Sequence, residues 1–216
     1  MSNLSKSGSR LKAAEDQAVP HPAVPDPGVP VSPAPSRADG TGIGALLQRS
    51  GFTLAGWRDN RRGEWWLVAQ LLLIAALLLP PWPAPAALGL AWPLAIRLAG
   101  AALVVIALVG GARSLLGLGA SLTPLPEPMP GAELVTSGPY ARCRHPLYRQ
   151  LLLGAAGMAL LLGSLLHLAL LLTLAAVLGG KARREERSLL ALHPGYRAYR
   201  AATPAIVPHL PWLDWR

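Results

Sequence analysis

The sequence from Leu147 to Gly180 reads LYRQLLLGAAGMALLLGSLLHLALLLTLAAVLGG. It holds two apolar runs, residues 147–162 and 165–180, that are separated only by Gly163 and Ser164. A helix over either run would be roughly 24 Å long at 1.5 Å per residue, which is close to the thickness of the hydrocarbon core of a bilayer. The stretch therefore predicts a tight antiparallel helical hairpin that enters a membrane and returns to the face it left.

Two further apolar runs, residues 65–79 and 93–112, precede this hairpin, and tryptophans lie at their ends, where the ring prefers the membrane interface. The chain is 52% hydrophobic and only 14% charged, whereas about a quarter of the residues of a soluble domain are charged. The sequence thus predicts an all-α polytopic membrane protein. We expect about four transmembrane helices, with a C-terminal helical hairpin and cytoplasmic C-terminal helices.

The positive charges predict the orientation of these helices. The formal net charge is +9, and eleven of the twenty arginines and lysines lie in three groups beside the apolar runs. They are Arg58, Arg61 and Arg62; Arg113, Arg142, Arg144 and Arg149; and Lys181, Arg183, Arg184 and Arg187. The other two connections, residues 80–92 and 163–164, carry no charge, so the positive-inside rule predicts that both termini are cytoplasmic. We expect a multi-pass protein of a bacterial inner membrane, with the lipid bilayer and not nucleic acid as the partner of the basic residues.

The chain is expected to have three parts. Residues 1–44 are rich in proline and poor in large apolar residues, so a disordered tail is expected. Residues 45–64 predict an amphipathic segment on the membrane surface, and residues 65–216 form the membrane domain. The chain has a single cysteine, Cys143, which excludes an internal disulfide, and no spacing of Cys and His predicts a metal site.

Polar residues that could carry chemistry occur on both sides of the hairpin. Residues 134–140 read LVTSGPY and are followed by Arg144, His145, Pro146 and Tyr148. Proline is favoured at the first turn of a helix, so Pro146 predicts that the third span begins there, with an N-terminus and an arginine that would suit a carboxylate.

After the hairpin come Glu185 and Glu186, and then Tyr196 and Tyr199 on a short helix. The carboxylates could hold hydroxyls, an amino group or a sulfonium, and the tyrosines could cover an adenine or a lipid. The alternative is a charged surface helix with ion pairs between neighbouring turns.

Together these residues resemble the isoprenylcysteine carboxyl methyltransferase family and the related phospholipid N-methyltransferases, over roughly residues 118–208. The resemblance implies that the protein binds S-adenosylmethionine at the cytoplasmic face and methylates a membrane-soluble acceptor, such as an isoprenoid, a lipid or a thiol. The cofactor-binding residues that it implies are Tyr140, Arg144, His145, Tyr148, Glu185, Glu186, Tyr196 and Tyr199. Among them, Arg144, His145 and Glu186 are the expected catalytic residues. Their roles would be positional, because an activated methyl group needs alignment and exclusion of water more than acid–base chemistry.

The chain departs from the family pattern at two positions. Gln150 stands where the family usually has a glycine, and Ala202 stands where members that act on prenylcysteine tend to have an arginine. The second departure puts carboxyl methylation in doubt, so the sequence does not identify the acceptor. Two other functions stay open: a membrane reductase with a related C-terminal hairpin, which would bind a nicotinamide, and a non-catalytic membrane scaffold or small transporter. The oligomeric state is not predicted.

Overall fold

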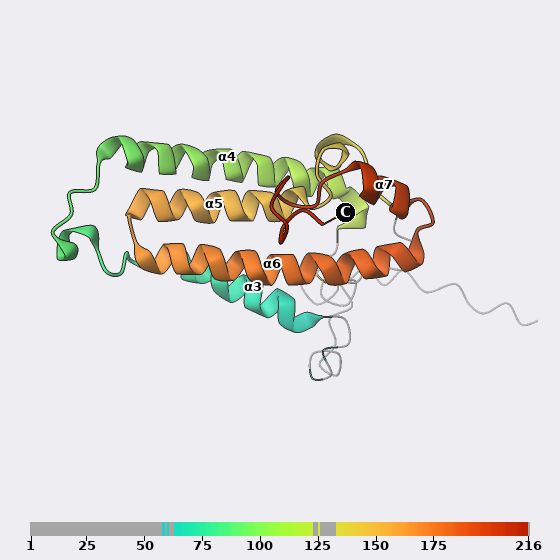
Figure 1. Ribbon diagram of the computed structural model, residues 1–216, viewed down its shortest axis with the longest axis horizontal. Coiled ribbons are helices and arrows are strands. Elements are labelled where there is room, and N and C mark those ends of the chain that lie inside the picture. The colour runs from blue at the N-terminus through green and yellow to red at the C-terminus, as the bar shows by residue number, and fades with distance from the viewer. Residues whose placement is uncertain (1–57, 59, 61–62, 123–124, 126–132, 216) are drawn as a thin grey trace, which may run out of the picture. The chain divides into compact units, whose positions relative to one another are not determined.

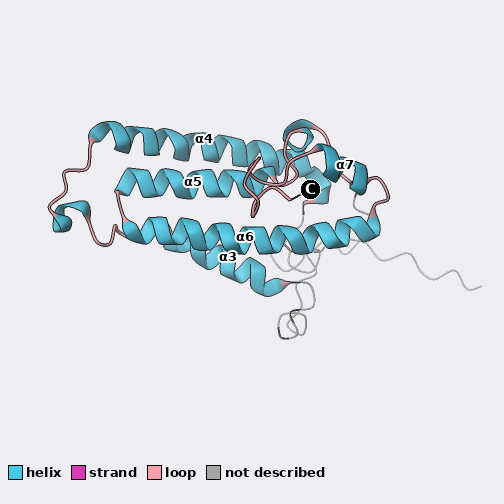
Figure 2. Cartoon of the chain, in the orientation of Figure 1, coloured by secondary structure: helices cyan, strands magenta, loops and turns pink. Residues whose placement is uncertain are grey.

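The computed structural model describes residues 58, 60, 63–122, 125 and 133–215. Within them, all regular structure is helical (Figure 2). The predicted tail, residues 1–44, and nearly all of the predicted surface segment, residues 45–64, lie outside the described residues. The α-helices are α3 (Glu64–Ala76), α4 (Leu94–Leu118), α5 (Pro146–Leu162), α6 (Leu165–Leu192) and α7 (Tyr196–Ala202). Short 3-10 segments occur at Pro85–Leu88, Gly119–Ser121 and Gly138–Ala141.

The four longer helices lie side by side (Figure 1). Helix α4 packs along α5, α5 packs on α6, and α3 packs on α6. Only Gly163 and Ser164 connect α5 to α6, and Gly163 has a φ of +60°, a left-handed conformation that glycine adopts without strain. The Ser164 hydroxyl fixes this turn, because it accepts a hydrogen bond from the Trp82 backbone N–H at 2.9 Å and donates one to the Trp82 carbonyl at 3.1 Å.

Glycines allow the backbones of α4 and α5 to approach closely. A Cβ atom added at Gly100 of α4 would lie 2.4 Å from the backbone nitrogen of Leu161. One added at Gly157 of α5 would lie 2.8 Å from the carbonyl oxygen of Gly100. Small residues at such crossings are typical of helix pairs in membranes, where packing replaces the hydrophobic driving force.

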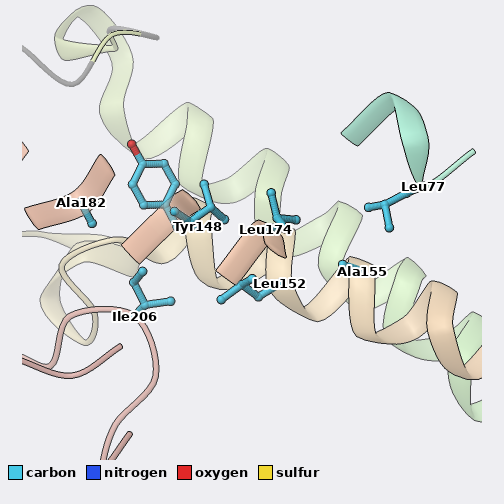
Figure 3. Close-up of a cluster of buried hydrophobic side chains, with 8 residues drawn as sticks. Leu77, Tyr148, Leu152, Ala155, Leu174, Ala182 and Ile206 are labelled. Atoms are coloured by element: carbon cyan, nitrogen blue, oxygen red, sulfur yellow. The ribbon is translucent and has the colours of Figure 1, made fainter. Parts of the chain in front are cut away.

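The core of the bundle lies where α5, α6 and the segment after α7 meet. Leu174, Leu178 and Ala182 are spaced four residues apart on α6 and have no exposed surface. They form one cluster with Tyr148 and Leu152 of α5, and Ile206 from the C-terminal segment completes it (Figure 3). The outer surface of α4 is also apolar, with leucines and valines exposed along its length. An exposed apolar face of this extent is expected of a membrane protein.

Two helices, α4 and α6, are long and apolar enough to cross a membrane. Both run beyond the predicted spans, which ended at residues 112 and 180. Arg, Lys, Glu and Leu favour helix, so each helix continues where the apolar run stops. Helix α4 ends only at Gly119, with a φ of +49°, and α6 continues to Leu192. The apolar helices α3, with 13 residues, and α5, with 17, are shorter, so four spans remain a prediction.

Candidate functional site

Most of the site residues predicted from the sequence lie at one end of the bundle. At this end α5 begins, α6 approaches its C-terminus, and α7 and the C-terminal segment fold over them (Figure 1). Pro146 is the first residue of α5 and His145 caps it. The tight turn between α5 and α6 brings the second half of α6 back beside the start of α5, so that side chains about forty residues apart come into contact.

Glu186 lies at the centre of a buried polar network and is 2% exposed. Its Oε1 accepts a hydrogen bond from Arg144 Nε at 2.7 Å and lies 3.0 Å from His145 Nε2. Its Oε2 accepts a hydrogen bond from Trp215 Nε1 at 2.7 Å, and Arg200 Nε lies 3.4 Å away. Four partners thus surround one carboxylate, which connects α5, α6, α7 and the C-terminal segment.

The guanidinium of Arg144 also makes several hydrogen bonds. Besides its contacts with Glu186, it donates to the backbone carbonyls of Arg200, at 2.9 Å, Thr203 and Trp215. A buried arginine whose N–H groups bond to a carboxylate and to several backbone carbonyls holds the surrounding chain in place. Arg144 and Glu186 therefore organise this end of the bundle.

The sequence did not reveal the C-terminal segment after α7 as part of the site. The backbone N–H groups of Arg144 and His145 donate to the carbonyls of Pro204 and Ala205, each at 2.9 Å. The carboxylate of Asp214 accepts hydrogen bonds from the backbone N–H groups of Ala205, at 3.2 Å, and His209, at 3.0 Å. The signal in the sequence was two tryptophans, Trp212 and Trp215, on either side of Asp214, and it names no partner.

His145, Tyr148 and Glu185 form a second group next to this network. The rings of His145 and Tyr148 are stacked, with centroids 5.3 Å apart and planes 3° from parallel. The hydroxyl of Tyr148 donates to Glu185 Oε2 at 3.0 Å. The Glu185 side chain is 25% exposed, whereas that of Glu186 is nearly inaccessible. Of the two adjacent glutamates, Glu185 is therefore the one that a ligand could reach.

Three tyrosines lie on the other side of the same region. The Tyr199 hydroxyl donates to the Tyr140 carbonyl at 2.5 Å, and the rings of Tyr196 and Tyr199 meet edge to face with centroids 5.8 Å apart. Burial raises the pKa of Tyr199 to about 12 and raises the pKa values of Tyr140 and Tyr196 further. All three hydroxyls therefore stay protonated at neutral pH. The Tyr196 side chain is 1% exposed, and its hydroxyl has no hydrogen-bond partner among the described residues.

Two cavities open beside these residues. The first lies between the second half of α6, α7 and the segment that contains Tyr140. The second lies between α3, α4, α6 and the start of α5, and leucines of α3, α4 and α5 form part of its wall. Leu118, Tyr140, Arg144, His145 and Glu185 line both cavities. The two cavities thus share one wall.

The cavities sort the predicted site residues into three groups. Tyr140, Arg144, His145, Glu185, Tyr196 and Tyr199 line the first cavity. Tyr148 lines the second cavity only. Glu186 lines neither and instead faces a shallow hollow with Arg200 and Trp215. Within the described part of the chain, no group of three His, Cys, Asp or Glu side chains could hold a metal ion.

The two departures from the family pattern also have definite places. Gln150 lines neither cavity, and its side chain lies against α4, where a Cβ atom at Gly110 would come within 2.5 Å of Gln150 Cδ. The missing side chain at Gly110 thus accommodates the larger residue at position 150. Ala202 is exposed, and Arg200, two residues earlier, reaches Glu186.

Comparison with known proteins agrees with the family resemblance. Residues 95–193 match the model of the phospholipid methyltransferase family. The chain is 44% identical over 78 residues to the cobalt-zinc-cadmium resistance protein CzcN of Cupriavidus metallidurans. These residues are 36% of this chain and 36% of that protein. It is 38% identical over 79 residues to the nickel-cobalt-cadmium resistance protein NccN of Alcaligenes xylosoxydans xylosoxydans, and these residues are 36% of this chain and 37% of that protein.

The matched part spans about a third of the length of these two relatives. No solved structure matches the chain. The family match includes α4, α5, α6 and six of the eight predicted site residues, all except Tyr196 and Tyr199. It therefore confirms the resemblance predicted from the sequence: residues 95–193, just under half of the chain, match the phospholipid methyltransferase family.

Proposed function

We propose that the protein is an S-adenosylmethionine-dependent methyltransferase that acts on a lipophilic acceptor within the membrane. The observation that carries this proposal is the wall that the two cavities share, formed by Tyr140, Arg144, His145 and Glu185. Methyl transfer requires a polar, charged cofactor and an apolar acceptor to meet at one point with water excluded. Two adjoining cavities with one shared wall would bring the two molecules to that point.

The residues of the first cavity fit the cofactor. The buried Tyr196 hydroxyl, which lacks a partner among the described residues, offers a hydrogen bond to a ligand. The Glu185 carboxylate is accessible and offers negative charge to an amino group, a sulfonium or ribose hydroxyls. The rings of Tyr140 and Tyr199 offer aromatic surface to an adenine. When bound, S-adenosylmethionine supplies a methyl group already activated by its sulfonium, so the protein has to bind, orient and desolvate.

The second cavity suits the acceptor. Its wall includes Leu67 and Leu71 of α3 and Leu115 and Leu118 of α4. Helix α3 packs on α6 and α4 packs on α5, while α3 and α4 make no substantial contact with each other in the described residues. A lipophilic molecule would enter between α3 and α4 from the bilayer, with its reactive group directed toward Glu185 and His145.

The network around Glu186 would position these groups. By fixing Arg144 and His145 between α6 and the C-terminal segment, Glu186 sets the orientation of the shared wall. We assign His145 and Glu185 to contact with the cofactor or the acceptor, and Arg144 and Glu186 to holding them in place. This assignment differs from the expectation from the sequence, in which Arg144 and Glu186 also bound the cofactor and were counted among the catalytic residues.

Binding of S-adenosylhomocysteine to the full chain in neutral detergent, measured by isothermal titration, tests the proposal. We expect Glu185→Gln and Tyr196→Phe to weaken binding by about tenfold each, the effect of losing one hydrogen bond or charge contact to a ligand. Arg187→Met, an exposed position on the same helix, should leave binding unchanged. Folded wild-type protein that binds no S-adenosylhomocysteine, or binds a nicotinamide nucleotide instead, would overturn the proposal.

We also propose a multi-pass arrangement with both termini in the cytoplasm. The arginines near α7 and at the start of α5 lie at the same end of the bundle as the cofactor cavity, and the cofactor is cytoplasmic. A fluorescent protein fused to the C-terminus should therefore fluoresce in living cells, whereas an alkaline phosphatase fused there should be inactive. The opposite pattern would reverse the orientation.

A further inference from the structure

Among the described residues, Arg97 is the one full charge at the end of the bundle opposite the cofactor cavity. This end consists of the segment between α3 and α4, the first turns of α4, the end of α5 and the start of α6 (Figure 1). Residues 65–112 contain no other Asp, Glu, Lys or Arg, and residues 150–180 contain none. Arg97 lies in the first turn of α4 and is exposed, as are its neighbours Leu94 and Leu98.

The protein supplies Arg97 with no counterion at this end. The chain has no Asp or Glu in residues 65–126 or 134–184, and within the described residues Arg97 makes no hydrogen bond or ion pair. Charged side chains in membrane-spanning helices are rare and pair with another group where they occur. The guanidinium of Arg97 therefore has to find its counterion outside the bundle.

The depth of Arg97 matches that of lipid head groups. Helix α4 has 25 residues and is about 37 Å long at 1.5 Å per residue, which exceeds a hydrocarbon core of about 30 Å. Its first turn therefore lies near the interface, and the long side chain of an arginine there extends toward the polar layer. Trp92, just before α4, is of the residue type that prefers the same level. Phosphate groups of the bilayer lie within reach of the guanidinium.

A hollow opens beside Arg97, between residues 81–92 and the end of α5. Its wall is apolar or aromatic apart from Arg97 and includes Pro85, Leu90, Trp92 and Leu161. The position of Trp92 is fixed, because its Nε1 donates a hydrogen bond to the Leu160 carbonyl at 2.7 Å. With the indole N–H bonded in this way, the guanidinium of Arg97 is the polar group that the hollow offers to a ligand.

We propose that Arg97 and this hollow bind one anionic phospholipid of the surrounding leaflet, with the lipid phosphate at the guanidinium and the glycerol and upper acyl chain against the apolar wall. A guanidinium presents its N–H donors in one plane and can pair with two phosphate oxygens. A head group without an ammonium of its own, such as phosphatidylglycerol, fits a site with a single cation. The inference does not depend on methyl transfer and requires only that the bundle crosses a membrane.

Photolabelling of the full chain in neutral detergent tests the site. The probe is a phosphatidylglycerol that carries a diazirine on one acyl chain, close to the glycerol, and peptide mass spectrometry measures the labelled fraction of residues 81–92. Residues 101–109 of α4, which expose Val105 and Leu108, are the internal reference for general lipid contact. The competitors are unlabelled phosphatidylglycerol, diacylglycerol with the same chains, and inorganic phosphate.

We expect phosphatidylglycerol to displace the probe from residues 81–92 at a concentration about tenfold lower than diacylglycerol does, the usual gain from a charge-assisted hydrogen bond. Residues 101–109 should show no such preference. Inorganic phosphate should not displace the probe at the same concentration, because a free anion makes no contact with the apolar wall. Equal displacement by phosphatidylglycerol and inorganic phosphate would indicate a site for free anions and would overturn the assignment to a lipid.

The variants are Arg97→Met, Arg97→Lys and Leu98→Met. Arg97→Met removes the charge but keeps a flexible side chain, so the preference for phosphatidylglycerol over diacylglycerol should fall to about twofold or less. Arg97→Lys keeps a positive charge and should keep most of the preference. Leu98→Met, at an exposed neighbouring position of α4, is the matched control and should keep it in full. Unfolding temperatures verify that each variant folds, and Arg97→Gln, with the same expected loss, replaces Arg97→Met if that variant does not.

Three results would contradict the inference: no preference for phosphatidylglycerol at residues 81–92 of the wild type, a preference that persists in a folded variant without the charge of Arg97, or an equal loss in Leu98→Met. The same preference at residues 101–109 would indicate general lipid contact and would also overturn it. Titration of the wild type with S-adenosylhomocysteine tests the proposed function separately, so either proposal can fail without the other.

Discussion

At the scale of single residues, the two adjacent glutamates on α6 have different surroundings. Both carboxylates were expected from the sequence to contact the cofactor. The structure surrounds Glu186 with Arg144, His145, Arg200 and Trp215, and leaves Glu185 at the cavity wall. One residue of difference in position rotates a helical side chain by about 100°, so neighbours on α6 face different compartments.

This difference predicts separate effects of the two substitutions. Glu186→Ala leaves the buried Arg144 without its carboxylate, and we expect a loss of about 3 to 5 kcal/mol in stability, the cost of breaking a buried ion pair. Glu185→Ala should cost about 1 kcal/mol or less, because it removes one partly exposed hydrogen bond, but should weaken S-adenosylhomocysteine binding. Thermal unfolding in detergent and titration of the same samples measure both. Equal destabilisation by the two changes would contradict the division of roles.

Cys143 gives a second prediction at this scale. It is 1% exposed, its Sγ donates to the Ala205 carbonyl at 3.0 Å, and burial raises its pKa above the ordinary value of a thiol. A raised pKa means less thiolate at any given pH, and the thiolate is the reactive form.

We therefore expect N-ethylmaleimide to label native protein at pH 7.5 much more slowly than protein denatured in dodecyl sulfate, at least tenfold from the thiolate fraction and burial together. As the pH is raised, labelling of the native protein should begin to accelerate at a higher pH than labelling of the denatured chain. Equal rates for native and denatured protein would show that the segment over Cys143 does not form.

At the scale of the elements, the ends of α5 could be predicted well and the ends of α4 and α6 poorly. Residues 147–162 were predicted as a span and α5 is Pro146–Leu162, because Pro146 and Gly163 each mark a boundary through their backbone preferences. Helices α4 and α6 have no such residue at the edge of the apolar run, so hydropathy marked the membrane surface and not the end of the helix.

The contact between α4 and α5 yields a matched pair of glycine substitutions on α4. Gly100→Ala places a Cβ within 2.4 Å of the Leu161 backbone nitrogen, so the helices must move apart, at a cost of about 1 to 3 kcal/mol. Gly111→Ala places a Cβ 4.0 Å from its nearest neighbour and should be neutral or slightly stabilising, because alanine favours helix. Unfolding temperatures of the two variants measure the difference, and a similar decrease in both would exclude close packing at Gly100.

At the scale of the whole molecule, the site depends on contacts between segments far apart in the chain, and these could not be predicted. The residue types of the cofactor region came from local motifs, whereas the pairing of residues 143–145 with residues 204–206 leaves no periodic pattern in the sequence. The hydrogen bond between Lys181 and Gln70 could not be predicted for the same reason, since it requires that α3 pack on α6. Hydropathy identifies which face of a helix is apolar but not which element packs against that face.

The C-terminal segment should therefore act as a clamp on the whole site. Removing residues 209–216 deletes the Trp215 contacts with Glu186 and Arg144 and the pairing of Leu213 with Ile206, so we expect a lower unfolding temperature and S-adenosylhomocysteine binding weakened more than tenfold. Trp215→Phe keeps an aromatic ring but loses the hydrogen bond to a charged carboxylate, and should cost about 1.5 to 3 kcal/mol while retaining part of the binding. Trp212→Phe, at an exposed indole nearby, is the matched control and should behave as wild type. The shortened chain could instead have the same unfolding temperature and the same affinity as the full chain. In that case the helices alone hold the polar network of Arg144 and Glu186, and the hairpin, not the C-terminal segment, positions the shared wall.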